Sequence, residues 1–158
     1  MVHITKKDLD KDNFYKDSGI NTTEEITCDE NLGYIKFKKS VITTKSIIIG
    51  IGCGIKAGWG IEAGWGIEAG DGIKAGLSII CKGILKFSYQ LFAGTCTWRE
   101  TNGEDLIVEC GKLETDGKII LGNLKETGNI LEIEKIKIID GKKYRLVEDA
   151  LNVKEKIE

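Results

Sequence analysis

The middle of the chain repeats every six residues, from Ile49 to Cys96. The first residue of each hexad is Ile or Leu, and the third is apolar throughout. Glycine occupies most of the fourth and sixth positions in the first five hexads. A period of six does not match the 3.6 residues of a helical turn, and glycine disfavours a helix by about 1 kcal/mol per site. The repeat therefore excludes a helix.

A chain of short strands that bend at glycines fits the same pattern. The apolar first and third side chains lie on one side of a strand, and the charged second residue points to the other side. One uninterrupted strand of this length would far exceed the usual five or six residues. Short strands that turn once per hexad describe a solenoid whose coils pair only with their neighbours. We therefore predict an all-β protein built on a short hexapeptide-repeat β-solenoid (β-helix).

The number of hexads per coil decides which side chains meet on adjacent coils. Three hexads per coil give a triangular solenoid, the arrangement with precedent among hexad repeats. Two per coil would place Lys56 beside Glu68 and Glu62 beside Lys74, which are attractive pairs. Three per coil place Lys56 beside Lys74 instead. Such pairs contribute only about 0.2–1 kcal/mol each, so we retain three hexads per coil as the prediction.

The flanking segments divide the chain into three predicted parts. Residues 1–31 are polar and weakly periodic, and we expect a partly ordered leader with one short strand near Glu25–Cys28. Residues 32–96 are expected to form the solenoid with N-terminal capping strands, because they are rich in β-branched residues. Residues 97–158 alternate apolar and charged side chains, which predicts an antiparallel β-meander. Its turns would fall at the hairpin dipeptides Asn102-Gly103, Asp116-Gly117 and Asp140-Gly141.

Charge and cysteine usage restrict the partners and the compartment. The chain has 23 Lys+Arg against 25 Asp+Glu, a net charge of −2, which gives no electrostatic indication of nucleic-acid binding. The longest apolar run, Ile47–Ile51, is too short to span a bilayer, and the N-terminus lacks the apolar core of a signal peptide. The five cysteines include no Cys-x-x-Cys pair. We expect a cytoplasmic protein without direct nucleic-acid or membrane contacts.

The residues offer little support for catalysis. His3 is the one histidine, which argues against His-based triads and His-containing zinc sites. Two tryptophans and three nearby acids could in principle form a sugar-binding face, as on catalytic β-helices. However, lysine and glutamate interchange at equivalent positions of the repeat, which is typical of a solvated face rather than of a fixed catalytic geometry. We predict no enzymatic activity, no cofactor, no metal site, and five thiols that serve mainly in packing.

Aromatic residues at the variable fifth position of the hexad are better candidates for binding. This position holds both Trp and Asp, so we expect it at an outward corner, where a carboxylate is not buried. Trp, Tyr and Arg are the residues that most often anchor protein interfaces. Packing of the same rings against the solenoid or the meander is the alternative. The candidate interaction residues are Trp59, Trp65, Tyr89, Trp98, Arg99, Glu62, Glu68 and Asp71.

Two segments carry a resemblance to known proteins: GIKAGWGIEAGWGIEAGDGIKAG (54–76) and LFAGTCTWRETNGEDLIVECGKLETDGKIILGNL (91–124). They resemble glycine-rich hexad-repeat proteins that are common in phages and mobile elements of low-GC Gram-positive bacteria. A looser likeness is to the polymer-forming bactofilins, whose β-helices lack enzymatic activity. The resemblance implies a β-solenoid encoded by a phage or prophage and acting in the cytoplasm of a bacterial host cell.

From this we expect a non-enzymatic protein-interaction module whose partner is a host or phage protein. Inhibition of a bacterial immune effector, in the manner of an anti-CRISPR protein, is one specific form of that expectation, and it follows from the resemblance alone. A self-assembling structural β-solenoid, including a homodimer formed through the solenoid edge or the meander, is one alternative. A carbohydrate-binding or carbohydrate-active β-helix protein that uses Trp59, Trp65 and the nearby acids is another.

Overall fold

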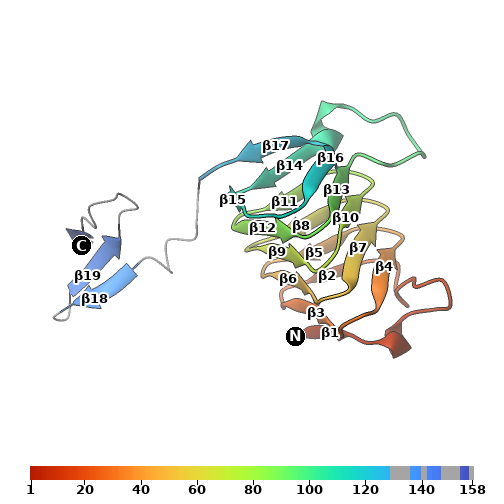
Figure 1. Cartoon of the computed structure of the whole chain (residues 1–158), viewed down its shortest axis with the longest axis horizontal. Helices are drawn as coiled ribbons and strands as arrows, with labels where there is room; N and C mark the ends of the chain where they lie inside the picture. The colour runs from red at the N-terminus through yellow and green to blue at the C-terminus, as the bar shows by residue number, and fades with distance from the viewer. Residues whose placement is uncertain (129–135, 140–141, 147–153, 157–158) are drawn as a thin grey trace.

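The computed structural model describes residues 1–128, 136–139, 142–146 and 154–156. Residues 2–126 form a parallel β-solenoid of about six coils. Three parallel sheets run along its length, and a regular coil contributes one strand to each of them (Figure 1). The all-β solenoid predicted from the hexad repeat is therefore confirmed, and it extends beyond the repeat on both sides.

Within each of the three sheets, strands from successive coils are hydrogen-bonded neighbours. Sheet 1 contains β1 (Val2–Ile4), β3 (Ile26–Cys28), β6 (Ile47–Ile49), β9 (Ile67–Ala69), β12 (Ile84–Phe87) and β15 (Lys112–Leu113). Sheet 2 contains β4 (Gly33–Phe37), β7 (Cys53–Ala57), β10 (Ile73–Ala75), β13 (Gln90–Ala93) and β16 (Lys118–Leu121). Sheet 3 contains β2 (Ile20–Thr22), β5 (Val41–Thr43), β8 (Ile61–Ala63), β11 (Ile79–Cys81), β14 (Ile107–Cys110) and β17 (Asn123–Glu126).

Two short 3-10 helices interrupt the strands, η1 (Lys6–Asp8) and η2 (Gly103–Leu106). A separate set of strands, β18 (Ile136–Ile139), β19 (Lys142–Leu146) and β20 (Lys154–Lys156), pairs in antiparallel fashion. The expected turn at Asp140-Gly141 lies outside the described residues, as do 129–135, 147–153 and 157–158. Over that part of the chain the meander stays a prediction.

The core is a stack of aliphatic side chains inside the solenoid. In the repeat, Ile55 of β7 pairs with Ile73 of β10 on the next coil. The two residues are three hexads apart in the sequence, so each coil contains three hexads, as predicted. In three-residue strands such as β8 and β9, the first and third residues point inward, and the second points outward. The inward positions are almost completely buried, with exposed fractions of 0–2% at Ile47, Ile49, Ile55, Ile61, Ile67, Ile73, Ile79, Leu85, Phe87 and Leu91. Burial of each such side chain contributes about 1.5–3 kcal/mol.

One residue expected in the core lies outside it. Strict six-residue counting assigns Ile51 to an inward third position, but its side chain is 72% exposed. The strand before it, β6, ends at Ile49, and β7 begins at Cys53, so Ile51 lies in the three-residue corner between these two strands. Gly52 turns this corner with a φ of +72°, and a methyl group there would overlap Asn31. The two side chains that point inward are therefore those of Ile47 and Ile49, whereas the six-residue count predicts Ile49 and Ile51.

The solenoid begins within residues 1–31, the segment expected to be a partly ordered leader. Strands β1, β2 and β3 all lie there, and β3 coincides with the strand expected near Glu25–Cys28. The first coil is closed by Leu9 and Tyr15, which pack against the core and form an antiparallel bridge. The Tyr15 and Phe37 rings lie 5.3 Å apart.

The residues from 107 to 126 also belong to the solenoid, although the sequence predicted an antiparallel meander there. Strands β14 and β17 pair in parallel with each other, and β14 pairs in parallel with β11. Alternation of apolar and polar side chains does not distinguish a parallel from an antiparallel strand, because both have a period of two. Two of the dipeptides that predicted hairpin turns have other roles in the structure. Asn102 caps η2, and Asp116-Gly117 forms a corner between β15 and β16.

The two ends of the solenoid differ. The first coil is covered by the segment containing Leu9 and Tyr15, whereas β15, β16 and β17 are the last strands of their sheets among the described residues. This last coil exposes apolar side chains at Ile120, Leu121 and Leu124. Its backbone edge and its apolar side chains together make it the least protected part of the solenoid.

Candidate functional site

The regular coils have three corners, each a short turn that contains glycine. The Trp59 corner joins sheet 2 to sheet 3, the Trp65 corner joins sheet 3 to sheet 1, and the Asp71 corner joins sheet 1 to sheet 2. The fifth hexad residue lies at these corners, as the sequence predicts, and Tyr89 occupies the Asp71 corner one coil later. Because there are three hexads per coil, successive aromatic residues point away from different corners of the solenoid.

The Trp59 corner gathers the largest group of the predicted interaction residues. The ring centroids of Trp59 and Trp98 are 6.1 Å apart, and their side chains are 42% and 56% exposed. The Lys39 Nζ atom lies 5.7 Å from the Trp59 ring centroid, and the Arg99 guanidinium carbon lies 5.2 Å from that of Trp98. We call Lys39, Trp59, Trp98 and Arg99 the aromatic–arginine patch. Sequence reasoning missed Lys39, since its approach to Trp59 depends on the longer coil before the repeat.

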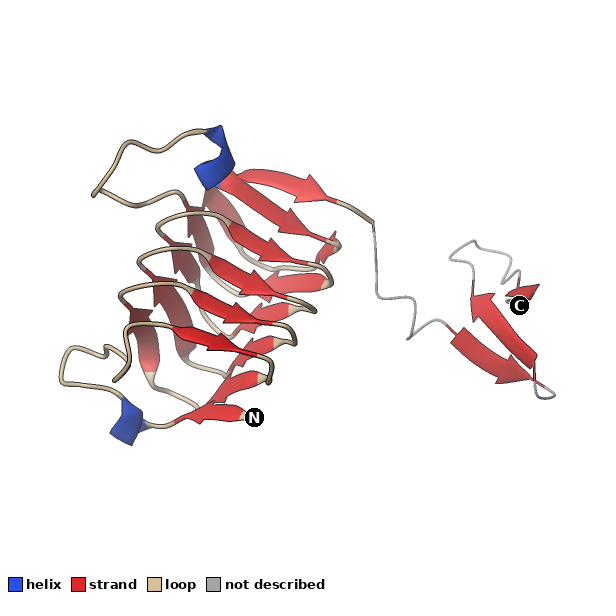
Figure 2. Cartoon of the chain, turned by 180° about the vertical axis from the view of Figure 1, so that it is seen from behind, coloured by secondary structure: helices blue, strands red, loops and turns tan. Residues whose placement is uncertain are grey.

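Trp98 and Arg99 belong to the segment between β13 and η2, which Figure 2 shows as a loop ahead of this short helix. Because this loop is an insertion, Ile79 pairs with Val108 rather than with a residue three hexads further along the chain. The start of the loop is fixed to the previous coil, where the Thr95 N–H donates to the Ala75 carbonyl at 3.2 Å. The Cys96 N–H donates to the Gly76 carbonyl at 3.0 Å. The patch therefore combines a corner of the regular solenoid with a loop anchored at the equivalent corner of the next coil.

Asp105 orders the far end of the loop. Its side chain is buried, and its carboxylate accepts hydrogen bonds from the Asn102 N–H at 3.0 Å and from Arg99 Nη2 at 2.7 Å. These contacts, the Asn102 backbone bond first, hold the pKa of the Asp105 carboxyl below its usual value. The carboxylate is therefore ionised at neutral pH and keeps the Arg99 guanidinium in place. The Asn102-x-x-Asp105 spacing of a capping box is the sequence signal that could have identified this helix start.

A shallow groove of about 380 Å³ lies beside the Trp65 corner, on the outer face of sheet 1. Trp65 and Ile48 provide its apolar surface, and Glu68, Lys86 and Glu114 provide its charged groups. The Glu68 Oε1 and Lys86 Nζ atoms are 3.9 Å apart. The groove therefore brings together two of the candidate residues, Trp65 and Glu68.

The remaining candidates lie on other parts of the surface. Asp71 and Tyr89 lie at the third corner, near Tyr34, whose phenol pKa is raised first by partial burial and then by the Asp71 charge. Glu62 lies on the outer face of sheet 3, paired with Ile42 and Ile80 on adjacent strands. The structure therefore does not assemble Trp59, Trp65 and the nearby acids into a single sugar-binding face.

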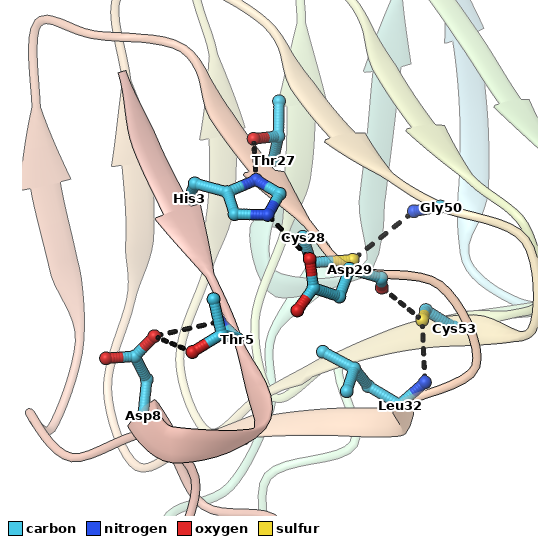
Figure 3. Close-up of polar contacts among 9 residues, drawn as sticks. All are labelled: His3, Thr5, Asp8, Thr27, Cys28, Asp29, Leu32, Gly50 and Cys53. Carbon is cyan, nitrogen blue, oxygen red and sulfur yellow. Dashed lines mark hydrogen bonds and ion pairs between the residues drawn. The ribbon is translucent and has the colours of Figure 1, made fainter.

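His3 lies in an arrangement that resembles a catalytic triad (Figure 3). Its Nδ1 atom is 2.7 Å from the Thr27 hydroxyl, and its Nε2 atom is 2.8 Å from Asp29 Oδ1. Thr27 lies on β3, which pairs with β1 on one side and β6 on the other, so its backbone is part of the sheet ladder. A backbone N–H committed to a ladder is not available to stabilise an oxyanion, which acyl transfer requires. We interpret the trio as a surface hydrogen-bond cluster that joins β1 to β3.

The thiols are mostly buried, as expected for packing residues. Burial raises the pKa of Cys81 to about 12, and burial is also the main cause that raises the pKa of Cys28 and of Cys110 to about 11. The Gly50 N–H donates to Cys28 Sγ at 3.3 Å, and the Leu32 N–H donates to Cys53 Sγ at 3.1 Å (Figure 3). A protonated thiol is a weak nucleophile, so the sulfurs of Cys28, Cys81 and Cys110 are poorly suited to covalent catalysis.

Within the described residues, no cluster of three or more His, Cys, Asp or Glu side chains could hold a metal ion. No helix in that part of the chain has the length and hydropathy needed to cross a membrane. Comparison with family models, with curated proteins and with solved structures finds no match for this chain. The resemblance to hexad-repeat phage proteins therefore stays an expectation from the sequence, whereas the β-solenoid rests on the strand pairing itself.

Proposed function

We propose that this protein is a non-enzymatic module that binds another protein through the aromatic–arginine patch. The observation that carries this proposal is the pairing of two exposed tryptophans, one on a solenoid corner and one on an inserted loop, beside an oriented arginine. Trp and Arg are enriched among the residues that dominate interface energies. Binding residues are also found disproportionately on loops held by a rigid scaffold.

The order of the loop supports the same proposal. Arg99 is held by the Asp105 carboxylate, and the loop is hydrogen-bonded to the corner beneath it. An interface whose side chains are already positioned loses less conformational entropy on binding than a mobile one. We propose a host or phage protein as the partner, acting in the bacterial cytoplasm. Inhibition of a bacterial immune effector is the specific form that follows from the sequence resemblance.

The test is affinity capture with the purified full chain as bait in a bacterial lysate. We expect a discrete partner to be retained by the wild-type protein and by Tyr89→Ala, which removes an exposed aromatic ring from a different corner. Trp98→Ala is expected to reduce capture by at least about tenfold, since truncation of a hot-spot residue costs about 2 kcal/mol or more. Equal capture by all three proteins, or no specific capture by the wild type, would contradict the proposal.

Self-assembly is a second candidate function, favoured by the exposed last coil of the solenoid. Ile120, Leu121 and Leu124 are exposed there beside the terminal strand edges, so the last coils of two copies could cover each other. In sedimentation velocity, the sedimentation coefficient of the wild-type chain is expected to rise with concentration. Leu124→Lys is expected to remain monomeric, whereas Ile51→Lys, at an exposed corner elsewhere, is expected to behave as the wild type. A wild-type chain that stays monomeric throughout would rule out this candidate.

A further inference from the structure

We propose that the outer face of sheet 2 binds single-stranded nucleic acid through a row of three lysines with a phenylalanine at each end. The row consists of Phe14, Lys36, Lys56, Lys74 and Phe92, which occupy successive cross-strand positions. Adjacent strands lie about 4.8 Å apart, so the three lysines extend over roughly 10 Å along the solenoid axis. This face is distinct from the aromatic–arginine patch, and the proposal does not depend on the protein-binding function.

The row follows from the number of hexads per coil. Because each coil of the repeat contains three hexads, the charged second positions at Lys56 and Lys74 fall on the same sheet, while Glu62 and Glu68 fall on the other two. Lys36 joins the row from β4, before the repeat begins. Net charge does not reveal this arrangement, since it sums over all three faces. The expectation of no nucleic-acid contact rests on that sum.

The lysine row is electrostatically unfavourable for the isolated protein. Like charges directly opposite each other on neighbouring strands destabilise a sheet. No carboxylate in the described part of the chain lies within ion-pair distance of Lys36, Lys56 or Lys74. The other two faces place opposite charges on neighbouring strands instead. Lys86 lies 3.9 Å from Glu68 on sheet 1, and Lys125 lies 3.6 Å from Glu109 on sheet 3.

The aromatic rings favour a single-stranded nucleic acid over an acidic protein surface. Phe14 and Phe92 are partly exposed, and lysine Nζ atoms lie 5.5 Å from the Phe14 centroid (Lys36) and 5.1 Å from the Phe92 centroid (Lys74). Proteins that bind single strands without sequence preference combine a line of cations along the backbone with aromatic rings on which bases stack. A linear row of cations with a ring at each end matches both requirements.

The other charged groups near the row leave the net charge of this face positive. Lys38 Nζ lies 5.9 Å from the Phe14 centroid and adds a further cation. Asp10 is a neighbouring acid, and its carboxylate already accepts the Phe14 N–H at 2.9 Å. Lys118 on β16 pairs with Gln90 of β13 at the far edge of the same sheet. The face therefore presents lysines to a phosphate backbone, with Asp10 at its margin.

The experiment measures fluorescence anisotropy of a labelled oligothymidylate titrated with the full chain at several salt concentrations. Three lysine–phosphate contacts predict a slope of log K against log salt of about −2, since each contact contributes about −0.7 for a single strand. Lys56→Gln is expected to reduce that slope by about 0.7. Phe92→Leu is expected to weaken binding by at least about fivefold with the slope unchanged, because base stacking is lost but the charges remain.

The matched control removes the same number of charges from other parts of the surface. The row variant carries Lys36→Gln, Lys56→Gln and Lys74→Gln. The control carries Lys7→Gln, Lys45→Gln and Lys82→Gln, which replace three exposed lysines outside the row. We expect the row variant to lose the salt-dependent binding while it keeps a cooperative thermal unfolding transition, because the three lysines lie on the outer face of the sheet and not in the core. The control is expected to bind as the wild type.

Three results would overturn the proposal. The first is a wild-type chain that does not bind the oligonucleotide at low salt. The second is equal binding by the row variant and the control variant, which would indicate attraction to charge in general. In the third, polyglutamate displaces the labelled oligonucleotide as effectively as unlabelled oligothymidylate of equal charge does. That result would assign the face to acidic proteins instead.

Discussion

Replacing Phe87 with alanine is expected to lower the free energy of unfolding by about 3–5 kcal/mol. Phe87 ends β12 and is 1% exposed, so its ring fills part of the solenoid interior. Its neighbour in the same sheet is Ala69, a small residue that cannot expand into the space left by the ring. The loss combines reduced burial with a cavity that the surrounding coils close only partly.

Urea unfolding followed by far-UV circular dichroism measures this loss. Tyr89→Ala is the matched control, because it removes a nearby aromatic ring from an exposed corner. Surface substitutions of this kind usually change stability by less than about 0.5 kcal/mol. A Phe87→Ala protein with the same midpoint and slope as the control would contradict the position of this ring in the core.

Replacing Gly76 with alanine is expected to destabilise the fold by about 3 kcal/mol or more, at the upper end of overpacking effects. A methyl group at Gly76 would overlap the carbonyl oxygen of Gly58, the equivalent corner residue of the preceding coil. The Gly76 N–H also donates to the Ala57 carbonyl at 2.9 Å. Stacked corners approach through their backbones, so neither corner can move aside without breaking this hydrogen bond.

The control for this substitution is Gly103→Ala, at a position where an added methyl would meet nothing within 4 Å. We expect Gly103→Ala to change stability by less than about 1 kcal/mol. Thermal melting of both variants and of the wild type, under the same conditions, compares the two positions. Equal melting temperatures for the two variants would show that the corners do not approach as closely as the structure indicates.

The repeat itself allowed the architecture to be predicted. Isoleucine at every sixth position, with an apolar residue two places later, requires one buried side of a strand, and the glycines allow the corners to stack closely. The prediction of three hexads per coil was correct even though it places Lys56 beside Lys74. Cross-strand charge pairs are weak compared with the burial of the isoleucine ladder, so charge pairing does not determine the coil.

The extent of the solenoid could not be predicted from the hexad period. Outside the repeat, the strands keep the pattern of an inward residue, an outward residue and a second inward residue, as in β3 and β14, but their corners vary in length. Ile35 pairs with Ile55 and Val2 pairs with Ile26, and both pairs lie further apart along the chain than three hexads. A fixed period detects only the coils with equal corners. The three-residue strand pattern is the feature common to the whole solenoid.

The candidate site was predicted in part. The exposed corner positions followed from the variable fifth residue of the hexad, and Trp59 and Trp98 were both named. Their proximity depends on the fold of the inserted loop, where Asp105 and Asn102 fix Arg99 through contacts that sequence spacing alone does not reveal. The lysine row was predicted only at its centre, where three hexads per coil place Lys56 beside Lys74. Lys36 and Phe14 join the row across separations longer than three hexads, which the fixed period does not reveal.

The return to the same sheet after every third hexad also limits how the length of such a chain can evolve. Duplication or loss of a whole coil leaves each later residue on its original side of the prism. Gain or loss of a single hexad within the repeat would keep the aliphatic interior intact but rotate everything downstream by one third of a turn. Where the change falls between Glu68 and Lys74, Lys74 would share a side with Glu62 or Glu68, and the row of lysines on one side would be broken while folding continued. Selection on the surface would therefore favour changes in multiples of three hexads.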